Sequence, residues 1–133
     1  MTNRQTISSG APWETIVGYS RAVRVGNHVS VAGTVAAGPD GAIVAPGDAY
    51  EQTKAIFTTI SAALAEAGAT MADVVRTRSF ITDISQWERF GQAHGEFFAD
   101  IRPASTLVEV SGLLGDGAVI EIEVDAWIPE AEE

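Results

Sequence analysis

Three carboxylates alternate with apolar residues near the C-terminal end of the chain and are the first candidates for chemistry. Glu121, Glu123 and Asp125 fall on one face of an extended segment. The opposite face carries only aliphatic side chains, namely Ile120, Ile122, Val124, Ala126 and Ile128. A carboxylate held against an apolar surface can serve as a general acid or base, because burial raises its pKa. The alternative interpretation of Glu121 is a solvated or arginine-paired strand carboxylate.

Other reactive side chains are scarce. The sequence has no cysteine, which excludes thiolate nucleophiles, disulfides and cysteine-ligated metals. Two histidines leave little for a metal site, and we expect no bound metal. His94 falls on an aromatic stripe and is predicted to be a packed or hydrogen-bonded core residue, whereas His28 sits at a predicted hairpin turn and should be exposed. The Gly115-Asp116-Gly117 segment is predicted to be a turn and not a phosphate cradle, because no helix follows it.

The charge of the chain narrows the possible partners. Its formal net charge is −10, and only 8 lysines and arginines are present. Nucleic-acid binding depends on neutralising phosphates with such side chains, so a nucleic-acid partner is not expected. The first twenty residues lack the apolar core of a signal peptide, and no segment approaches the roughly 20 apolar residues of a membrane span. We therefore expect a soluble, cytoplasmic protein without a membrane partner.

The candidate carboxylates belong to a predicted β-hairpin. Residues 106–113 and 118–128 are both extended in pattern, and the Gly115-Asp116-Gly117 turn separates them. A second hairpin is predicted from residues 22–25 and 28–35, around Gly26-Asn27. In its second arm Val29, Val31 and Val35 should form an apolar face, alternating with small or polar side chains. Residues 4–8 could add a short edge strand, and residues 73–82 are predicted to form a further strand.

Two helices are predicted between these strands. Asp48 and Glu51 have the spacing of a capping box, apolar residues then recur at helical spacing, and Gly68 is a natural stop. Ser85 and Glu88 repeat the capping-box spacing before a second helix that should end near Asp100. Its apolar stripe consists of Trp87, Phe90, His94, Phe97 and Phe98.

These elements predict one α+β domain that spans residues 1–133. Two helices can cover only one face of the sheet that they join. Either the second face lies in water, as is common for antiparallel sheets, or it packs against copies of itself in a closed symmetric oligomer. Periodicity does not choose between these two arrangements.

Several segments resemble the YjgF/RidA (reactive intermediate deaminase, Rid) family. They are RPASTLVEV at residues 102–110 with IEIE at 120–123, VGYSRAVRVGNHVSVAG at 17–33, the helix that contains Gln52, and VVRTRSFITDISQWERFGQAHGEFF at 74–98. The similarity runs from about residue 16 to residue 126. It implies a chorismate-mutase-like mixed sheet with two helices on one face, assembled as a homotrimer with a central barrel and small-molecule clefts at the subunit interfaces. For the best-known branch it implies hydrolysis of 2-imino or enamine acids to 2-oxo acids and ammonia, without a cofactor.

The resemblance also assigns roles to individual positions. Glu121 matches the acid that is thought to hold or activate the attacking water, and it is the candidate catalytic residue. The candidate substrate-binding positions are Tyr19, Ala32, Gly33, Gly91, Ser105, Thr106 and Leu107. Gly91 stands where the family often has an asparagine, so that contact is missing.

Ser105 departs from the family pattern at the position of an arginine that clamps the substrate carboxylate. A serine offers one neutral hydrogen bond, worth about 0.5–1.5 kcal/mol, in place of a charged fork. Arg102 lies three positions away and is a poor substitute unless the turn redirects it. Arg76 and Arg78 either pair with strand carboxylates such as Glu121 and Glu123 or supply the missing charge.

Two classes of function therefore remain. One is a Rid-family hydrolase with an altered choice of imine, enamine or related substrate. The other is a trimer that binds or senses a metabolite without turnover. Ribonuclease activity, a third association of the family, fits poorly with the acidic composition.

Overall fold

A computed structural model describes residues 4–130 and contains one six-stranded sheet. Its strands are β1 (Arg4–Ile7), β2 (Ala22–Val25), β3 (His28–Thr34), β4 (Val74–Ile81), β5 (Ala104–Glu109) and β6 (Ile120–Trp127). Its helices are α1 (Ala49–Glu66) and α2 (Trp87–Phe98), with short helical turns η1 (Glu14–Gly18), η2 (Met71–Asp73) and η3 (Ile84–Gln86). Residues 1–3 and 131–133 of the predicted domain lie outside the described part.

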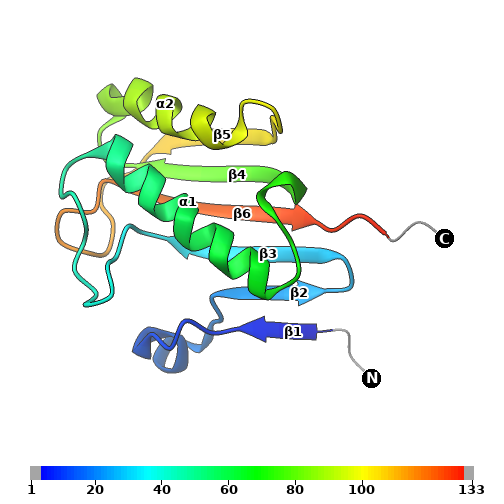
Figure 1. Ribbon diagram of the computed structural model, residues 1–133. Helices are drawn as coiled ribbons and strands as arrows, with labels where there is room; N and C mark the ends of the chain where they lie inside the picture. Colours follow the sequence, from blue (N-terminus) through cyan, green and yellow to red (C-terminus); the bar gives the residue numbers. More distant parts are fainter. Residues whose placement is uncertain (1–3, 131–133) are drawn as a thin grey trace.

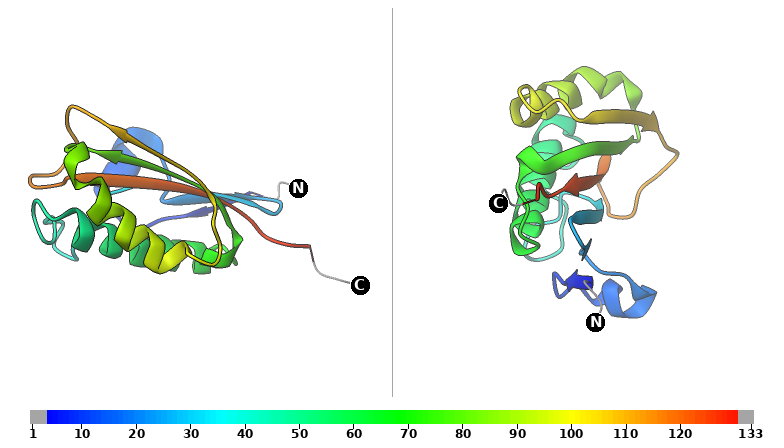
Figure 2. Two further views of the ribbon diagram at one scale, coloured as in Figure 1. Left: turned by 90° about the horizontal axis from the view of Figure 1, so that it is seen from above. Right: turned by 90° about the vertical axis from the view of Figure 1, so that its right-hand side faces the viewer.

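The strands are ordered β1-β2-β3-β6-β4-β5 across the sheet (Figure 1). All neighbours run antiparallel except β4 and β5, which run parallel and are joined through α2. Both α1 and α2 lie on the same face of the sheet, as expected (Figure 2). The other face carries neither α1 nor α2 and is called the open face below.

Strand β6 separates the core from the open face. Ile120, Ile122, Val124 and Ala126 are at most 1% exposed and face the helices. Against them pack α1 side chains that are completely buried, namely Ile56, Phe57, Ile60 and Leu64. Each such side chain contributes about 1.5–3 kcal/mol by its removal from water. The predicted division of β6 into an apolar and an acidic face is confirmed.

Helix α1 begins and ends where the sequence indicates. The Asp48 carboxylate accepts a hydrogen bond from the Glu51 backbone N–H at 3.0 Å. Gly68 follows the helix with a φ of +89°, a conformation that glycine adopts without strain. Between these ends the fully buried Gln52 donates from Nε2 to the carbonyls of Ala45 and Gly117 and accepts from the Val119 N–H. One amide thereby joins α1 to the two loops beside it.

The predicted C-terminal hairpin is wrong. Strand β4 lies between β5 and β6, and β5 ends at Glu109. Both arms are extended as expected, but alternation of side chains does not say which strand lies alongside. The chain needs residues 110–119 to pass from β5 to β6, and the turn at Gly115 and Gly117 packs within this loop against Ile43 and Pro46.

The expected alternation along β3 is interrupted. Val29 and Val31 are buried, but the next buried position is Thr34 and not Val35. The register shifts between Val31 and Thr34, so Ala32 and Gly33 together occupy the place opposite Glu123. This β-bulge moves the following side chains to the other face.

The start of α2 also differs from its expected form. Asp83, and not Ser85, caps this region: its carboxylate accepts from the Ser85 N–H at 3.0 Å at the start of η3. The Ser85 hydroxyl donates to the same carboxylate at 2.6 Å, so it does not cap the helix. The helix continues from η3 at Trp87 and ends at Phe98, near the predicted end.

Replacement of Gln52 by leucine should strongly destabilise the fold. It leaves the carbonyls of Ala45 and Gly117 and the N–H of Val119 without this partner, at about 1–3 kcal/mol for each buried group. The matched control is Thr53→Val at the next position, where a fully buried hydroxyl has no partner within the described chain. Urea unfolding should show a large loss for Gln52→Leu and no loss, or a gain, for Thr53→Val. Equal losses would contradict this account.

Candidate functional site

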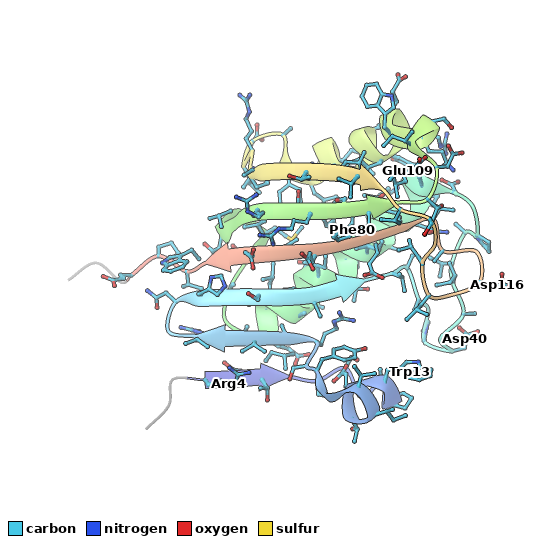
Figure 3. All side chains as sticks on the ribbon, turned by 180° about the vertical axis from the view of Figure 1, so that it is seen from behind. Arg4, Trp13, Asp40, Phe80, Glu109 and Asp116 are labelled. Atoms are coloured by element: carbon cyan, nitrogen blue, oxygen red, sulfur yellow. The ribbon has the colours of Figure 1, made fainter. Side chains whose placement is uncertain are left out.

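Figure 3 views the open face, where a polar network joins β3, β6 and β4. Arg78 on β4 donates from Nη1 to Asp125 Oδ2 at 3.0 Å and lies 3.5 Å from Glu123 Oε1. The Ser30 hydroxyl donates to Asp125 Oδ1 at 3.0 Å, and His28 Nε2 lies 2.8 Å from Ser30 Oγ. The expected pairing of Arg78 with a strand carboxylate is therefore present, which ties this guanidinium to the network.

His28 is less exposed than expected. Its ring lies edge-on to Trp127 with 5.3 Å between ring centroids, and its Nδ1 is buried without a partner in the described chain. The hairpin turn itself forms as predicted, but the pairing of β3 with β6 places Trp127 opposite His28. That neighbour could not be identified while the strand order was unknown.

Glu121 occupies a half-buried position at one end of this face. Its partner on β4 is Phe80, labelled in Figure 3. Burial raises the pKa of Glu121 above the ordinary 4.5; nearby Arg21 opposes this shift, and Glu123 adds to it. A carboxyl group with a raised pKa in a partly desolvated setting is suited to proton transfer or to holding a water molecule.

Gly33 and Arg21 build the surroundings of Glu121. A Cβ atom added at Gly33 would overlap the Glu121 carboxylate, so the glycine provides its space. Arg21 donates from Nη2 to the Gly33 carbonyl at 2.7 Å, while its buried Nε has no partner within the described residues. The sequence analysis did not select Arg21. The sequence could have pointed to Arg21 only through its position, two residues after Tyr19 and directly before β2.

Tyr19 lies at the end of η1, at the edge of a concavity on the open face. The concavity has a volume of about 810 Å³, and its lining includes Tyr19, Ser30, Ala32, Arg78, Glu123 and Asp125. Buried Glu14 anchors η1: it accepts hydrogen bonds from the Ser8 and Ser9 hydroxyls and from the Ser9 N–H. Burial raises the pKa of Glu14, but these hydrogen bonds outweigh it and the net pKa is lowered. Tyr19 and Ala32 thus share one hollow.

Strand β5 carries Ser105, Thr106 and Leu107 at the edge of the sheet. Ser105 pairs with the buried Thr77, and Leu107 pairs with the buried Ser79, so both lie on the helix-covered side. Thr106 pairs with Arg78 and lies on the open face. The sheet therefore separates Ser105 from Glu121 within one subunit.

Ser105 belongs to a second polar cluster on the helix side. Thr77 Oγ1 and Ser105 Oγ lie 2.9 Å apart in a hydrogen bond, and His94 Nε2 lies 2.9 Å from the same Thr77 oxygen. His94 is a packed, hydrogen-bonded residue, as expected from its place on the aromatic stripe. Burial lowers its pKa below the ordinary 6.5.

The remaining candidate positions contact nothing that marks a site. A Cβ atom at Gly91 would have no heavy atom within 4 Å, so nothing packs against α2 at this position. Arg102 is exposed with a φ of +57° before Pro103 and has no salt bridge among the described residues. Arg76 likewise has no salt bridge among the described residues.

Two further features follow from residues 4–130 as a whole. No group of three or more histidine and carboxylate side chains in this part could hold a metal ion. Neither helix in this part combines the length and apolarity that a membrane crossing requires.

Replacement of Glu121 by glutamine should stabilise the fold at neutral pH. Because folding raises the Glu121 pKa, its ionised form is disfavoured in the folded state above pH 4.5, and this penalty disappears when the group is protonated in both states. The gain in Tm should therefore be present at pH 7 and should vanish as the pH falls below about 4.5. The control is Glu130→Gln, which removes an exposed carboxylate. A gain that is independent of pH, or one shared by the control, would refute the assignment.

Comparisons with known proteins agree on one family. The family model described as Endoribonuclease L-PSP matches residues 9–128. An uncharacterised protein of Streptomyces coelicolor is 40% identical over 121 residues, which cover 91% of this chain and 90% of that protein. The 3-aminoacrylate deaminase RutC of Acinetobacter baylyi is 34% identical over 104 residues, which cover 78% of this chain and 82% of the deaminase.

A solved structure gives the same result. A Mycobacterium tuberculosis protein, described as a member of the highly conserved YjgF/YER057c/UK114 family, superimposes with a TM-score of 0.85. It is 46% identical, and the match covers 94% of this chain and 99% of the mycobacterial one. The α+β fold and the order of its elements, together with the family match over residues 9–128, place this chain in the YjgF/RidA family.

Proposed function

We propose that this protein is a cofactor-free hydrolase of small imines or enamines, assembled as a homotrimer with its clefts at the subunit interfaces. The observation that carries the proposal is Glu121, a half-buried carboxyl group with a raised pKa at the family's acid position. The 34% identity to a relative named 3-aminoacrylate deaminase supports the choice of reaction. Water would add to the C=N carbon, and collapse of the adduct would release ammonia and leave a C=O group.

Glu121 would hold and polarise the attacking water. A positioned acid–base group contributes about 10²–10⁴-fold to such a reaction, most effectively when its pKa approaches the working pH. Burial moves the Glu121 pKa in that direction, and Gly33 leaves room for the carboxylate. Tyr19, Ala32 and Gly33 would line the same side of the cleft.

The separation of the two halves of the site supports assembly into an oligomer. Ser105 and Glu121 lie on opposite sides of the sheet, so a cleft that uses both needs Ser105 of one subunit beside Glu121 of the next. Ser105 and the backbone amides at Thr106 and Leu107 would then hold the substrate. Trp13, Ile16 and Val17 on and beside η1 are 63%, 71% and 69% exposed, which favours a protein neighbour near Tyr19.

Ser105 would change the choice of substrate. The guanidinium fork that binds a carboxylate is absent here, and a single hydroxyl replaces it. Substrates with a smaller or neutral polar group should therefore be accepted. The second candidate function, a trimer that binds a metabolite without turnover, rests on this same loss of the arginine.

The wild-type protein should accelerate loss of enzymatically generated 2-iminopropionate or 3-aminoacrylate, measured as ammonia release against buffer. Glu121→Gln should lower kcat/KM by about 100-fold, because the acid–base group is lost. The control, Glu130→Gln, should retain wild-type activity. If neither substrate is lost faster than in buffer, the deaminase proposal fails and the non-catalytic alternative is favoured. If Glu121→Gln keeps full activity, Glu121 is not the acid–base group.

Light scattering after gel filtration should give a mass three times the 14.0 kDa of the chain. The trimer should persist in Glu121→Gln, because this change alters a cleft side chain and not the packing of the subunits. A stable monomer at micromolar concentration would end the interface-cleft proposal, whatever the activity.

A further inference from the structure

Three polar side chains form a continuous chain from the sheet edge into the core. Ser105 Oγ on β5 is 2.9 Å from Thr77 Oγ1 on β4, which is 2.9 Å from His94 Nε2 on α2. Ser105 is exposed, Thr77 is 0% exposed, and His94 is half-buried. One end of the chain therefore meets solvent, and the other ends inside the fold.

The surroundings of His94 are aromatic. Phe98, Phe90 and Phe57 have ring centroids 4.9, 5.4 and 5.6 Å from the imidazole. These rings come from α2 and α1, and Thr77 and Ser105 complete the contacts from β4 and β5. No charged side chain contributes to the lowered His94 pKa, which has burial as its cause. The imidazole is therefore neutral at pH 7, with one ring nitrogen free to accept a proton.

The two hydroxyls can pass a proton in either direction. A threonine or serine hydroxyl has one proton and two acceptor positions, and it rotates to suit its partners. With the imidazole protonated at Nδ1, Ser105 donates to Thr77 and Thr77 donates to His94 Nε2. With the other tautomer, both hydrogen bonds reverse. Thr77 thus links a buried base to an exposed hydroxyl that the base does not touch.

We propose that Ser105, Thr77 and His94 form a proton relay that serves the interface cleft, with Ser105 as the group that contacts the substrate or its attacking water. This inference rests on the proposed function and adds a second acid–base system to Glu121. In this arrangement Ser105 supplies proton transfer at the position where the family has a carboxylate clamp. Thr77 and His94 are positioning residues, because they act through Ser105.

The relay gains and loses no protons over one reaction. As water adds to the C=N carbon, its proton moves to Ser105 Oγ, the Ser105 proton moves to Thr77 Oγ1, and the Thr77 proton moves to His94 Nε2. The reverse transfer delivers that proton to the departing nitrogen when the adduct collapses. Water and the C=N compound become a C=O compound and ammonia, and no oxidant or cofactor is consumed. The aromatic pocket disfavours the imidazolium, so it returns the proton readily.

Nitrogen-15 NMR of His94 tests the relay without turnover. The relay requires that the Nδ1-protonated tautomer, in which Nε2 accepts from Thr77, be detected in the wild-type protein at pH 7. Thr77→Val should alter the Nε2 signal, and Ser105→Ala should alter it through Thr77. Exclusive protonation of Nε2 in the wild-type protein would overturn the proposal.

Kinetics test the relay during hydrolysis. Thr77→Val should lower kcat at least ~10-fold with little change in KM, because it removes the hydroxyl that joins Ser105 to His94 but keeps the shape of the side chain. Thr77→Ser, which restores a hydroxyl, should recover most of kcat. The dependence of kcat on the D₂O fraction should be curved for the wild type, as several protons move together, and linear for Thr77→Val. The control is Thr53→Val, a buried threonine without a partner in the described chain, which should leave kcat unchanged.

The outcomes separate the two proposals. Unchanged kcat in Thr77→Val, or failure of Thr77→Ser to restore it, would overturn the relay while the hydrolase stands. If the wild-type protein hydrolyses no imine or enamine, the proposed function fails, and the tautomer of His94 then decides alone whether a relay-competent chain exists.

Discussion

The burial of one face of β6 is the constraint on which the rest of the structure depends. Four aliphatic side chains of this strand are at most 1% exposed, and they fix its orientation against the helices. Because side chains alternate along a strand, Glu121, Glu123 and Asp125 must then face away from the helices. A shift of one residue in register would bury three carboxylates, so the core determines where the acidic groups lie.

This arrangement makes the sheet a barrier between two polar sites. The open face holds the Arg78–Asp125 network and Glu121, while the helix side holds the chain from Ser105 to His94. No side chain crosses a β-sheet, so a single subunit cannot join these groups in one cleft. In the proposed homotrimer, the sheet edge of one copy would complete the open face of another, and oligomeric state and chemistry would then be linked.

The sequence predicted local features better than neighbours in space. Alternation in β6, the Asp48 cap and the Gly26-Asn27 turn depend on residues close in sequence, and each was identified. The position of β5 beside β4 depends on a crossover through α2, and alternation contains no information about it. The resemblance selected Ser105 and Glu121 but could not place them on opposite sides of the sheet. Arg21 was missed because its partner Gly33 becomes adjacent only when β2 and β3 pair around the bulge.

The charges of the open face also bear on the name of the matching family model, Endoribonuclease L-PSP. RNA binding needs cations that are free to release counterions from phosphates. Arg78, the guanidinium at the centre of the face, is already bound by Asp125 and lies beside Glu123. Symmetric assembly would bring further copies of the same acidic strand together and raise the repulsion of a polyanion. These charges support the proposal of a small substrate with little negative charge and argue against a nucleic acid.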